Sequence, residues 1–288
     1  MIRPLVVAAA TVAVGALPLV ALAQSAPTPA PSASPSPAAS ATSSVIGPAL
    51  SANDPCTTLS NIVTRPTVTN AVCTVRPDHV EIEAGYQNMT VNGSGQTVIY
   101  PQSLIRIGTK LRGLEVQVAP PSYERTTVGG VARGTTDMGY GLKYVLGATP
   151  KVYYGVQVSA TVPTGQNGFS AGSTQTLYSL QGSYIISPAL SLFAGAQDQI
   201  LAVNGIHFGS FVPSLGLSAS LPASFLAFGE VAQFTHAIGL DTPTRTQYIG
   251  GIARDFGQRL QVDTEFGFSP TVSTGKYHFV GAGFAYYF

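Results

Sequence analysis

The sequence has no tryptophan and little charge. Asp, Glu, Lys and Arg together make up 9% of its 288 residues, whereas they make up roughly a quarter of an average soluble domain. The formal net charge of +1 gives no reason to expect nucleic acid as a partner. This composition is not typical of a soluble enzyme. The lack of tryptophan also departs from the aromatic girdles of most membrane proteins.

Long apolar runs are missing after the first residues of the chain. No central stretch reaches the about 18 apolar residues that a transmembrane helix needs, although the mean hydropathy is +0.25. This excludes an internal transmembrane helix. The chain is instead rich in Gly (31 residues), Tyr (13) and Phe (13). A transmembrane β-barrel fits this combination, because its strands need only about ten residues each and alternate in polarity.

The start of the chain indicates export. Arg3 precedes an apolar run that ends in Ala21-Leu22-Ala23, which predicts a signal peptide over residues 1–23. An uncleaved membrane anchor is the alternative. Residues 24–52 are rich in Pro, Ala and Ser and are predicted to form a disordered linker.

Cys56 and Cys73 are the only two cysteines. In an exported chain, an intramolecular disulfide is the default interpretation, and closing this loop is worth about 3 kcal/mol in the chain-entropy model. Metal ligation is disfavoured because only His79 lies nearby. We therefore predict a disulfide-closed periplasmic segment over residues 53–77, with no metal site and no cofactor.

Period-two alternation begins near residue 78. In "VEIEAGY", Val80 and Ile82 fall on one face, and Glu81 and Glu83 on the other. Such alternation predicts strands with one apolar and one polar face. Twelve candidates begin near Val80, Leu104, Leu114, Met138, Val152, Leu177, Leu190, Leu215, Phe225, Tyr248, Leu260 and Phe279. The ninth and tenth candidates alternate poorly, so the sequence does not decide which of their side chains point inward.

The connections between these segments alternate between tight and longer. Short connections such as "GATPK" alternate along the chain with long connections such as "NGSGQTVIYPQ" and "PPSYERTTVGGVARGTT". One rim with short turns and one with long loops is typical of bacterial outer-membrane barrels. We predict an all-β, transmembrane antiparallel up-and-down barrel of about twelve strands over residues 78–288, with its ends and short turns facing the periplasm. The alternative is a soluble sandwich or lipocalin-like barrel. It is disfavoured because twelve strands enclose more room than apolar side chains can fill.

If the apolar face contacts lipid, the polar face lines the lumen. This places seven charged residues inward: Glu81, Glu83, Arg106, Glu115, Lys143, Asp263 and Glu265. Unpaired charge in a narrow lumen is costly, so we expect acid–base pairing there. The remaining charge is negative, which disfavours anions and favours neutral or cationic solutes.

The chain ends in "GAGFAYYF". Gly283, Tyr286 and Phe288 stand where the last strand of outer-membrane proteins carries its assembly signal. Phe284, Tyr286 and Phe288 share one face, which fits a strand with its aromatics toward lipid. The expected partners are outer-membrane lipid and the barrel assembly machinery of a Gram-negative bacterium, in whose outer membrane the protein is expected.

The middle of the chain carries a family resemblance. "TTDMGYGLKYVLG" contains Asp137, Gly141, Lys143 and Tyr144, and the next segment ends in Pro163-Thr164-Gly165. Over residues 80–288 this resembles the outer-membrane family labelled for the meta-pathway of phenol degradation. The resemblance implies transport of aromatic or other small molecules and brings no catalytic residue.

An enzyme is not expected. "GFSAG" around Ser170 matches a nucleophile motif, but that motif requires a strand–turn–helix setting and here lies between two predicted strands. The leading interpretation is passage of small, neutral or aromatic solutes. The alternative is a structural or adhesive barrel with a blocked lumen and partner-binding loops.

The terminal pattern generates a first prediction. Deleting Phe288 is expected to lower the amount of folded, heat-modifiable protein in the outer membrane, because the assembly signal loses its terminal aromatic. Gel shifts of membrane fractions measure this amount. Unchanged levels under strong expression would contradict the assignment.

Overall fold

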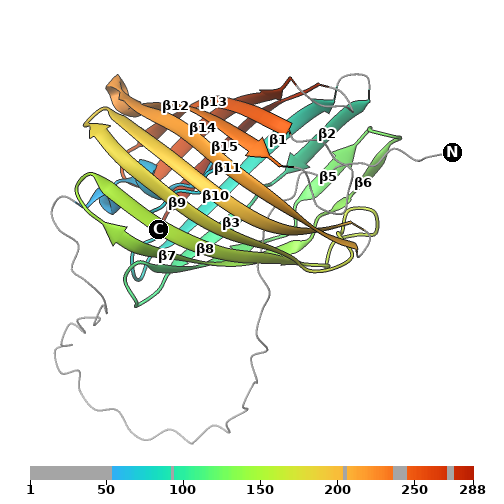
Figure 1. Ribbon diagram of the computed structural model, residues 1–288, viewed down its shortest axis with the longest axis horizontal. Helices are drawn as coiled ribbons and strands as arrows, with labels where there is room; N and C mark the ends of the chain where they lie inside the picture. The colour runs from blue at the N-terminus through green and yellow to red at the C-terminus, as the bar shows by residue number, and fades with distance from the viewer. Residues whose placement is uncertain (1–53, 92–93, 204–205, 236–244, 271–275) are drawn as a thin grey trace, which may run out of the picture.

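The computed structural model describes residues 54–91, 94–203, 206–235, 245–270 and 276–288. The predicted signal peptide and linker lie outside the described residues. The described chain forms one antiparallel β-barrel with a short N-terminal segment (Figure 1). Its strands are β1 (Val80–Val91), β2 (Gly95–Tyr100), β3 (Leu104–Gly108), β4 (Leu114–Ala119), β5 (Tyr123–Thr126), β6 (Ala132–Thr135), β7 (Met138–Ala148), β8 (Val152–Val162), β9 (Gln175–Ser187), β10 (Leu190–Val203), β11 (Ile206–Leu221), β12 (Phe225–Phe234), β13 (Arg245–Phe256), β14 (Leu260–Ser269) and β15 (Tyr277–Tyr287). The helices are η1 (Pro55–Thr57), α1 (Leu59–Ile62) and η2 (Pro222–Ser224).

These elements make a closed wall of twelve strands. β1 pairs with β2 toward one end and with β3 toward the other, so β2 and β3 are halves of one wall strand, interrupted near Pro101, which has no N–H to donate. In the same way β4 continues into β5, and β6 into β7. β15 pairs with β1 from Glu81↔Tyr287 to Val91↔Tyr277 and closes the barrel. The predicted fold class is confirmed, and each predicted start lies within an observed strand.

Two of the predicted long loops are wrong. "NGSGQTVIYPQ" contains β2, and "PPSYERTTVGGVARGTT" contains β5 and β6. The register Thr97↔Thr126 pairs β2 with β5. Hydrogen bonds between these strands therefore continue the barrel wall through residues that were predicted, from their composition, to form turns. Strand formation depends on neighbouring strands as much as on local propensity.

Side chains alternate between the outer surface and the lumen. Val156, Val262 and Phe284 are 36%, 42% and 44% exposed. Their chain neighbours Gln157 and Asp263 are buried and face the lumen. The poorly alternating β12 follows the same rule, with Phe228 and Glu230 buried. Among the described residues, no helix is both long and apolar enough to cross a membrane.

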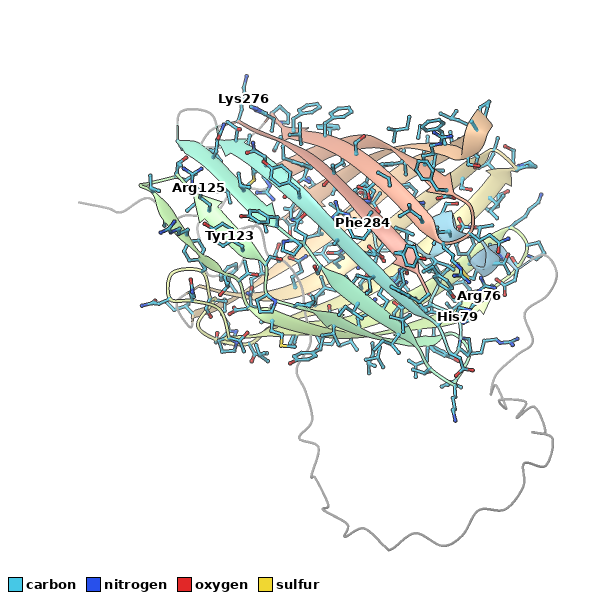
Figure 2. The ribbon with its side chains drawn as sticks, turned by 180° about the vertical axis from the view of Figure 1, so that it is seen from behind. Arg76, His79, Tyr123, Arg125, Lys276 and Phe284 are labelled. Carbon is cyan, nitrogen blue, oxygen red and sulfur yellow. A yellow bond between two sulfur atoms is a disulfide. The ribbon has the colours of Figure 1, made fainter. Side chains whose placement is uncertain are left out.

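The two ends of the barrel differ. One end, called the short-turn end, carries the connections at residues 109–113, 149–151, 188–189, 222–224 and 257–259. Phe288 also lies there, and its N–H donates to the Val80 carbonyl. Figure 2 shows Arg76 and His79 at the short-turn end, and Arg125 and Lys276 at the opposite end.

Candidate functional site

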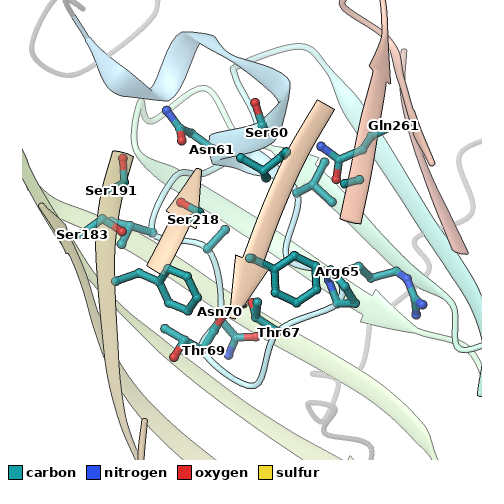
Figure 3. A pocket seen from close by; sticks show the side chains of 18 of the residues that line it. Ser60, Asn61, Arg65, Thr67, Thr69, Asn70, Ser183, Ser191, Ser218 and Gln261 are labelled. Carbon is teal, nitrogen blue, oxygen red and sulfur yellow. Dashed lines mark hydrogen bonds between the residues drawn. The ribbon is translucent and has the colours of Figure 1, made fainter. Parts of the chain in front are cut away.

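Residues 54–77, called the lumen segment, lie inside the barrel near the short-turn end (Figures 1 and 3). The Cys56–Cys73 disulfide closes the segment on itself. Ile62, Val72 and Cys73 pack with Tyr153 and Tyr287 of the wall. The predicted disulfide is therefore present, and the segment that carries it contacts the inward face of the barrel.

Arg106 is the centre of a buried charge network. Its guanidinium donates to Glu81 at 2.8 Å, to Glu83 at 3.0 Å and to both oxygens of Glu115 at 2.9 Å. Lys143 lies 3.4 Å from Glu115. All five side chains are at most 1% exposed. Because a buried charge is tolerated only when it is paired and hydrogen-bonded, these residues hold one another inside the wall.

The same cations also hold the lumen segment. Arg106 donates to the backbone carbonyls of Ile62 and Cys73. Lys143 donates to the carbonyl of Ala71 at 2.9 Å. The network, whose residues come from β1, β3, β4 and β7, therefore joins four strands of the wall to the disulfide-closed part of the segment.

Wall carboxylates hold the segment through its backbone N–H groups. Glu83 accepts from Thr64 and Arg65 at 2.9 and 3.0 Å. Glu230 accepts from Val68 and Thr69, both at 2.7 Å. In each case the two oxygens of one carboxylate satisfy two donors at two neighbouring residues. Charge-assisted hydrogen bonds of this kind are stronger than neutral ones.

A third carboxylate and a hydroxyl add to this binding. Glu115 accepts from the Val75 N–H at 2.7 Å. The Thr69 hydroxyl lies 2.6 Å from that of Ser214. The segment is thus bound from several sides of the lumen.

Arg65 of the segment pairs with Asp263 at 3.5 Å. Its guanidinium lies over the paired glycines Gly85 and Gly283. A Cβ built at Gly85 would lie 2.2 Å from Arg65 Cζ, and one at Gly283 would lie 2.4 Å from Arg65 Nε. Gly283, which was predicted as part of the assembly signal, therefore also makes room for the segment.

The seven predicted lumen residues are all buried. Five of them meet in the Arg106 network, while Asp263 pairs with Arg65. Glu265 is separate and accepts a long hydrogen bond of 3.4 Å from Gln87. Sequence reasoning missed Arg65, which lies in the segment predicted to be outside the barrel, and Glu230, which lies on a poorly alternating strand.

A small cavity lies between the segment and the wall. It measures about 80 Å³ and is lined by polar side chains such as Asn61, Asn70 and Ser183 (Figure 3) and by apolar ones such as Phe193 and Leu226. It has room for a few water molecules and is small beside the about 300–1,000 Å³ of a typical ligand pocket. The lumen is therefore largely filled near the short-turn end in the part of the chain that the structure describes.

Asp137 has a structural role in the motif that carried the family resemblance. Its two carboxylate oxygens accept from the N–H groups of Gly165 and Ala171, both at 2.8 Å. The Thr164 hydroxyl accepts from the Met138 N–H at 2.8 Å. These bonds fasten the connection of residues 163–174 to the start of β7. Ser170 lies in that connection, and its hydroxyl accepts from the Gly172 N–H.

Comparison with known proteins gives similarity in structure but not in sequence. No family model and no curated protein sequence matches this chain. The COG4313 outer membrane channel from Pseudomonas putida F1 is similar with a TM-score of 0.57 at 13% identity, over 78% of this chain and 100% of that chain.

Two further solved structures are less similar. The KdgM porin has a TM-score of 0.49 at 11% identity, over 71% of this chain and 98% of that chain. The translocator domain of autotransporter NalP from Neisseria meningitidis has a TM-score of 0.47 at 15% identity, over 72% and 87%. At 13% identity the likeness to the COG4313 channel shows a shared fold. The chain therefore has the fold of outer-membrane β-barrels, and its membership in the phenol-pathway family stays a prediction.

The Arg106 network generates a second prediction. Arg106→Met leaves Glu81, Glu83 and Glu115 buried with one cation, which is expected to cost about 3–5 kcal/mol of unfolding free energy. The urea midpoint of the heat-modifiable band in micelles measures this loss. Arg254→Met is the control, because Arg254 is exposed and stacks on Phe225 and Phe256. Equal midpoints for Arg106→Met and the control would contradict the role of the network.

Proposed function

We propose that the protein is an outer-membrane channel for small neutral or aromatic solutes, and that the lumen segment is its periplasmic gate. The fold supports a channel, since it is shared with an outer-membrane channel at a TM-score of 0.57. The inward face supplies polar side chains along the lumen. The predicted export signal and terminal strand support the outer membrane as the location.

The observation that carries this proposal is how the lumen segment is bound. Its tip, at Val68 and Thr69, is held mainly by one carboxylate, Glu230, and by the carboxamide of Gln197. A hydrogen bond to a charged group contributes about 1.5–3 kcal/mol net, because water competes for both partners. Contacts of this strength keep the tip in place and still allow the tip to move aside, while the disulfide-closed part of the segment stays bound to the Arg106 network.

The charge pairing also bears on selectivity. Glu83, Glu115, Glu230 and Asp263 are occupied by the lumen segment or by wall cations. Little unpaired negative charge then remains near the short-turn end to attract cations. Neutral solutes are therefore favoured over cations, although the excess of acidic residues in the sequence allowed both.

The second candidate function is a structural or adhesive barrel. The filled lumen favours it, because a permanently closed barrel needs no path for solutes. Its loops would then bind a partner. The two functions differ in whether the tip of the segment ever moves aside.

Conductance in a planar bilayer tests the proposal. Wild-type protein is expected to give small or infrequent current steps. The double variant Glu83→Gln/Glu230→Gln is expected to raise the open fraction roughly tenfold or more. Each amide offers one acceptor oxygen in place of two and turns its NH₂ toward the second N–H, which weakens the hold on the segment.

Glu124→Gln is the matched control, since Glu124 is a buried wall carboxylate on β5 with no hydrogen bond to the lumen segment among the described contacts. It is expected to behave like wild type. If neither wild type nor the double variant gives stepwise current, the channel proposal fails and the structural barrel takes its place.

A further inference from the structure

Away from the lumen segment, one side of the inner wall is polar and uncharged. Inward side chains of β8 and β9 form a polar strip that consists of Gln157, Ser159, Thr161, Ser179 and Gln181. The register Gln157↔Ser179 places the two strands side by side on this face. All five side chains are buried, with exposed fractions between 1% and 8%.

The polar strip has unused hydrogen-bonding capacity. Gln157 Oε1, Ser159 Oγ, Thr161 Oγ1 and Gln181 Nε2 have no partner among the described residues. These atoms comprise one acceptor, one donor and two hydroxyls that can do either. Buried polar groups are normally satisfied. The set is suited to a partner that itself both donates and accepts, as alcohol groups do.

The facing side of the wall carries an apolar cluster. Phe228, Ile249 and Phe279 form this buried cluster with Tyr277, and Met89 and Val68, the latter from the tip of the lumen segment, pack against it; we call Phe228, Ile249, Phe279 and Met89 the apolar strip. Two buried carboxylates adjoin it, since Glu230 pairs in register with Ile249 and Glu265 with Gly251. These residues come from β12, β13, β15 and β1. In the closed order of twelve wall strands, β8 and β9 are fifth and sixth, and β12, β13 and β15 are ninth, tenth and twelfth, so Phe279 on β15 lies opposite β9 and the rest of the apolar strip extends along the wall beside it.

Two phenyl rings of the apolar strip lie over wall glycines. A Cβ built at Gly251 would lie 2.3 Å from Phe228 Cζ, and one at Gly267 would lie 2.2 Å from Phe279 Cε1. Each ring occupies the room that a missing side chain leaves on the neighbouring strand. Rings seated against the wall in this way are suited to stacking on a flat apolar group.

From these two strips we infer the class of solute, on the basis of the proposed channel function: a neutral amphipathic molecule with hydroxyl groups on one side and a flat apolar group on the other, as in an aryl glycoside. A hydrocarbon would leave the polar strip without partners. A free sugar would leave the apolar strip without a contact. Of the two carboxylates that adjoin the apolar strip, Glu230 is bound by the lumen segment and Glu265 accepts from Gln87, so both disfavour an anionic solute there and neither is left without a partner for a cation.

Binding to the folded full-length protein tests this inference. Isothermal titration in a detergent without a sugar headgroup compares phenyl β-glucoside with glucose and with benzyl alcohol. Phenyl β-glucoside is expected to bind at least roughly tenfold more tightly than either, because it alone engages both strips. The titrations are run on wild type and on Glu83→Gln/Glu230→Gln, so that closure by the lumen segment does not hide the strips.

Variants assign the binding to the two strips. Ser159→Ala/Thr161→Val is expected to weaken phenyl β-glucoside binding roughly tenfold and to leave benzyl alcohol binding unchanged. Phe279→Ala is expected to weaken the two aromatic probes and to leave glucose unchanged. Thr264→Val is the matched control, because Thr264 lies on the outer face of β14.

Equal affinity for phenyl β-glucoside and benzyl alcohol would overturn the inference, as would binding that Ser159→Ala/Thr161→Val does not change. Bilayer current separates this result from a failure of the channel function. Stepwise current without the binding preference leaves the channel standing and removes the solute class. Preferred binding of phenyl β-glucoside without stepwise current leaves the solute class standing and removes the channel function.

Discussion

Carboxylates inside the barrel need partners, and the chain supplies those partners from its own N-terminal segment. Glu83 and Glu230 each accept two backbone N–H groups from the lumen segment, and Asp263 pairs with Arg65. In a low-dielectric lumen an unpaired carboxylate is costly. The position of the segment, the small size of the remaining cavity and the difference between the two halves of the lumen all depend on this constraint.

The wall could be predicted from the sequence because its pattern is local. Alternation in "VEIEAGY" and "RLQVDTEFGF" set which side chains face inward, and inward Glu81, Glu83, Asp263 and Glu265 followed from the period of two. The disulfide followed from the presence of only two cysteines. The strands β2, β5 and β6, which were predicted to be loops, could not be found in this way, because pairing with neighbouring strands decides them.

The lumen segment could not be predicted because its contacts are remote in sequence. Val68 and Thr69 bind Glu230, which lies more than 160 residues away, and no periodicity in residues 54–77 signals those bonds. Glu230 itself lies in "FLAFGEVAQF", where alternation is poor. Gly85 and Gly283 were a signal that could have been used, since paired small residues on the inward face mark a close approach to the wall.

The lumen therefore has two chemically distinct parts. Near the short-turn end it is charged, paired and filled. Farther along, the uncharged polar strip faces the apolar strip, which Glu230 and Glu265 adjoin. The connection that Asp137 fastens to β7 follows Val162, at the end of the strand that carries Thr161, so the Asp137 motif supports the wall next to the polar strip.

Hydrogen exchange of the lumen segment in the folded barrel tests the central claim most directly. If wall carboxylates bind this segment inside the lumen, the amides of Thr64, Arg65, Val68, Thr69 and Val75 will exchange far more slowly than those of an unstructured chain. The slow exchange should persist at neutral pH in native-like micelles. Exchange of all five amides at the rate of a free peptide would contradict the account.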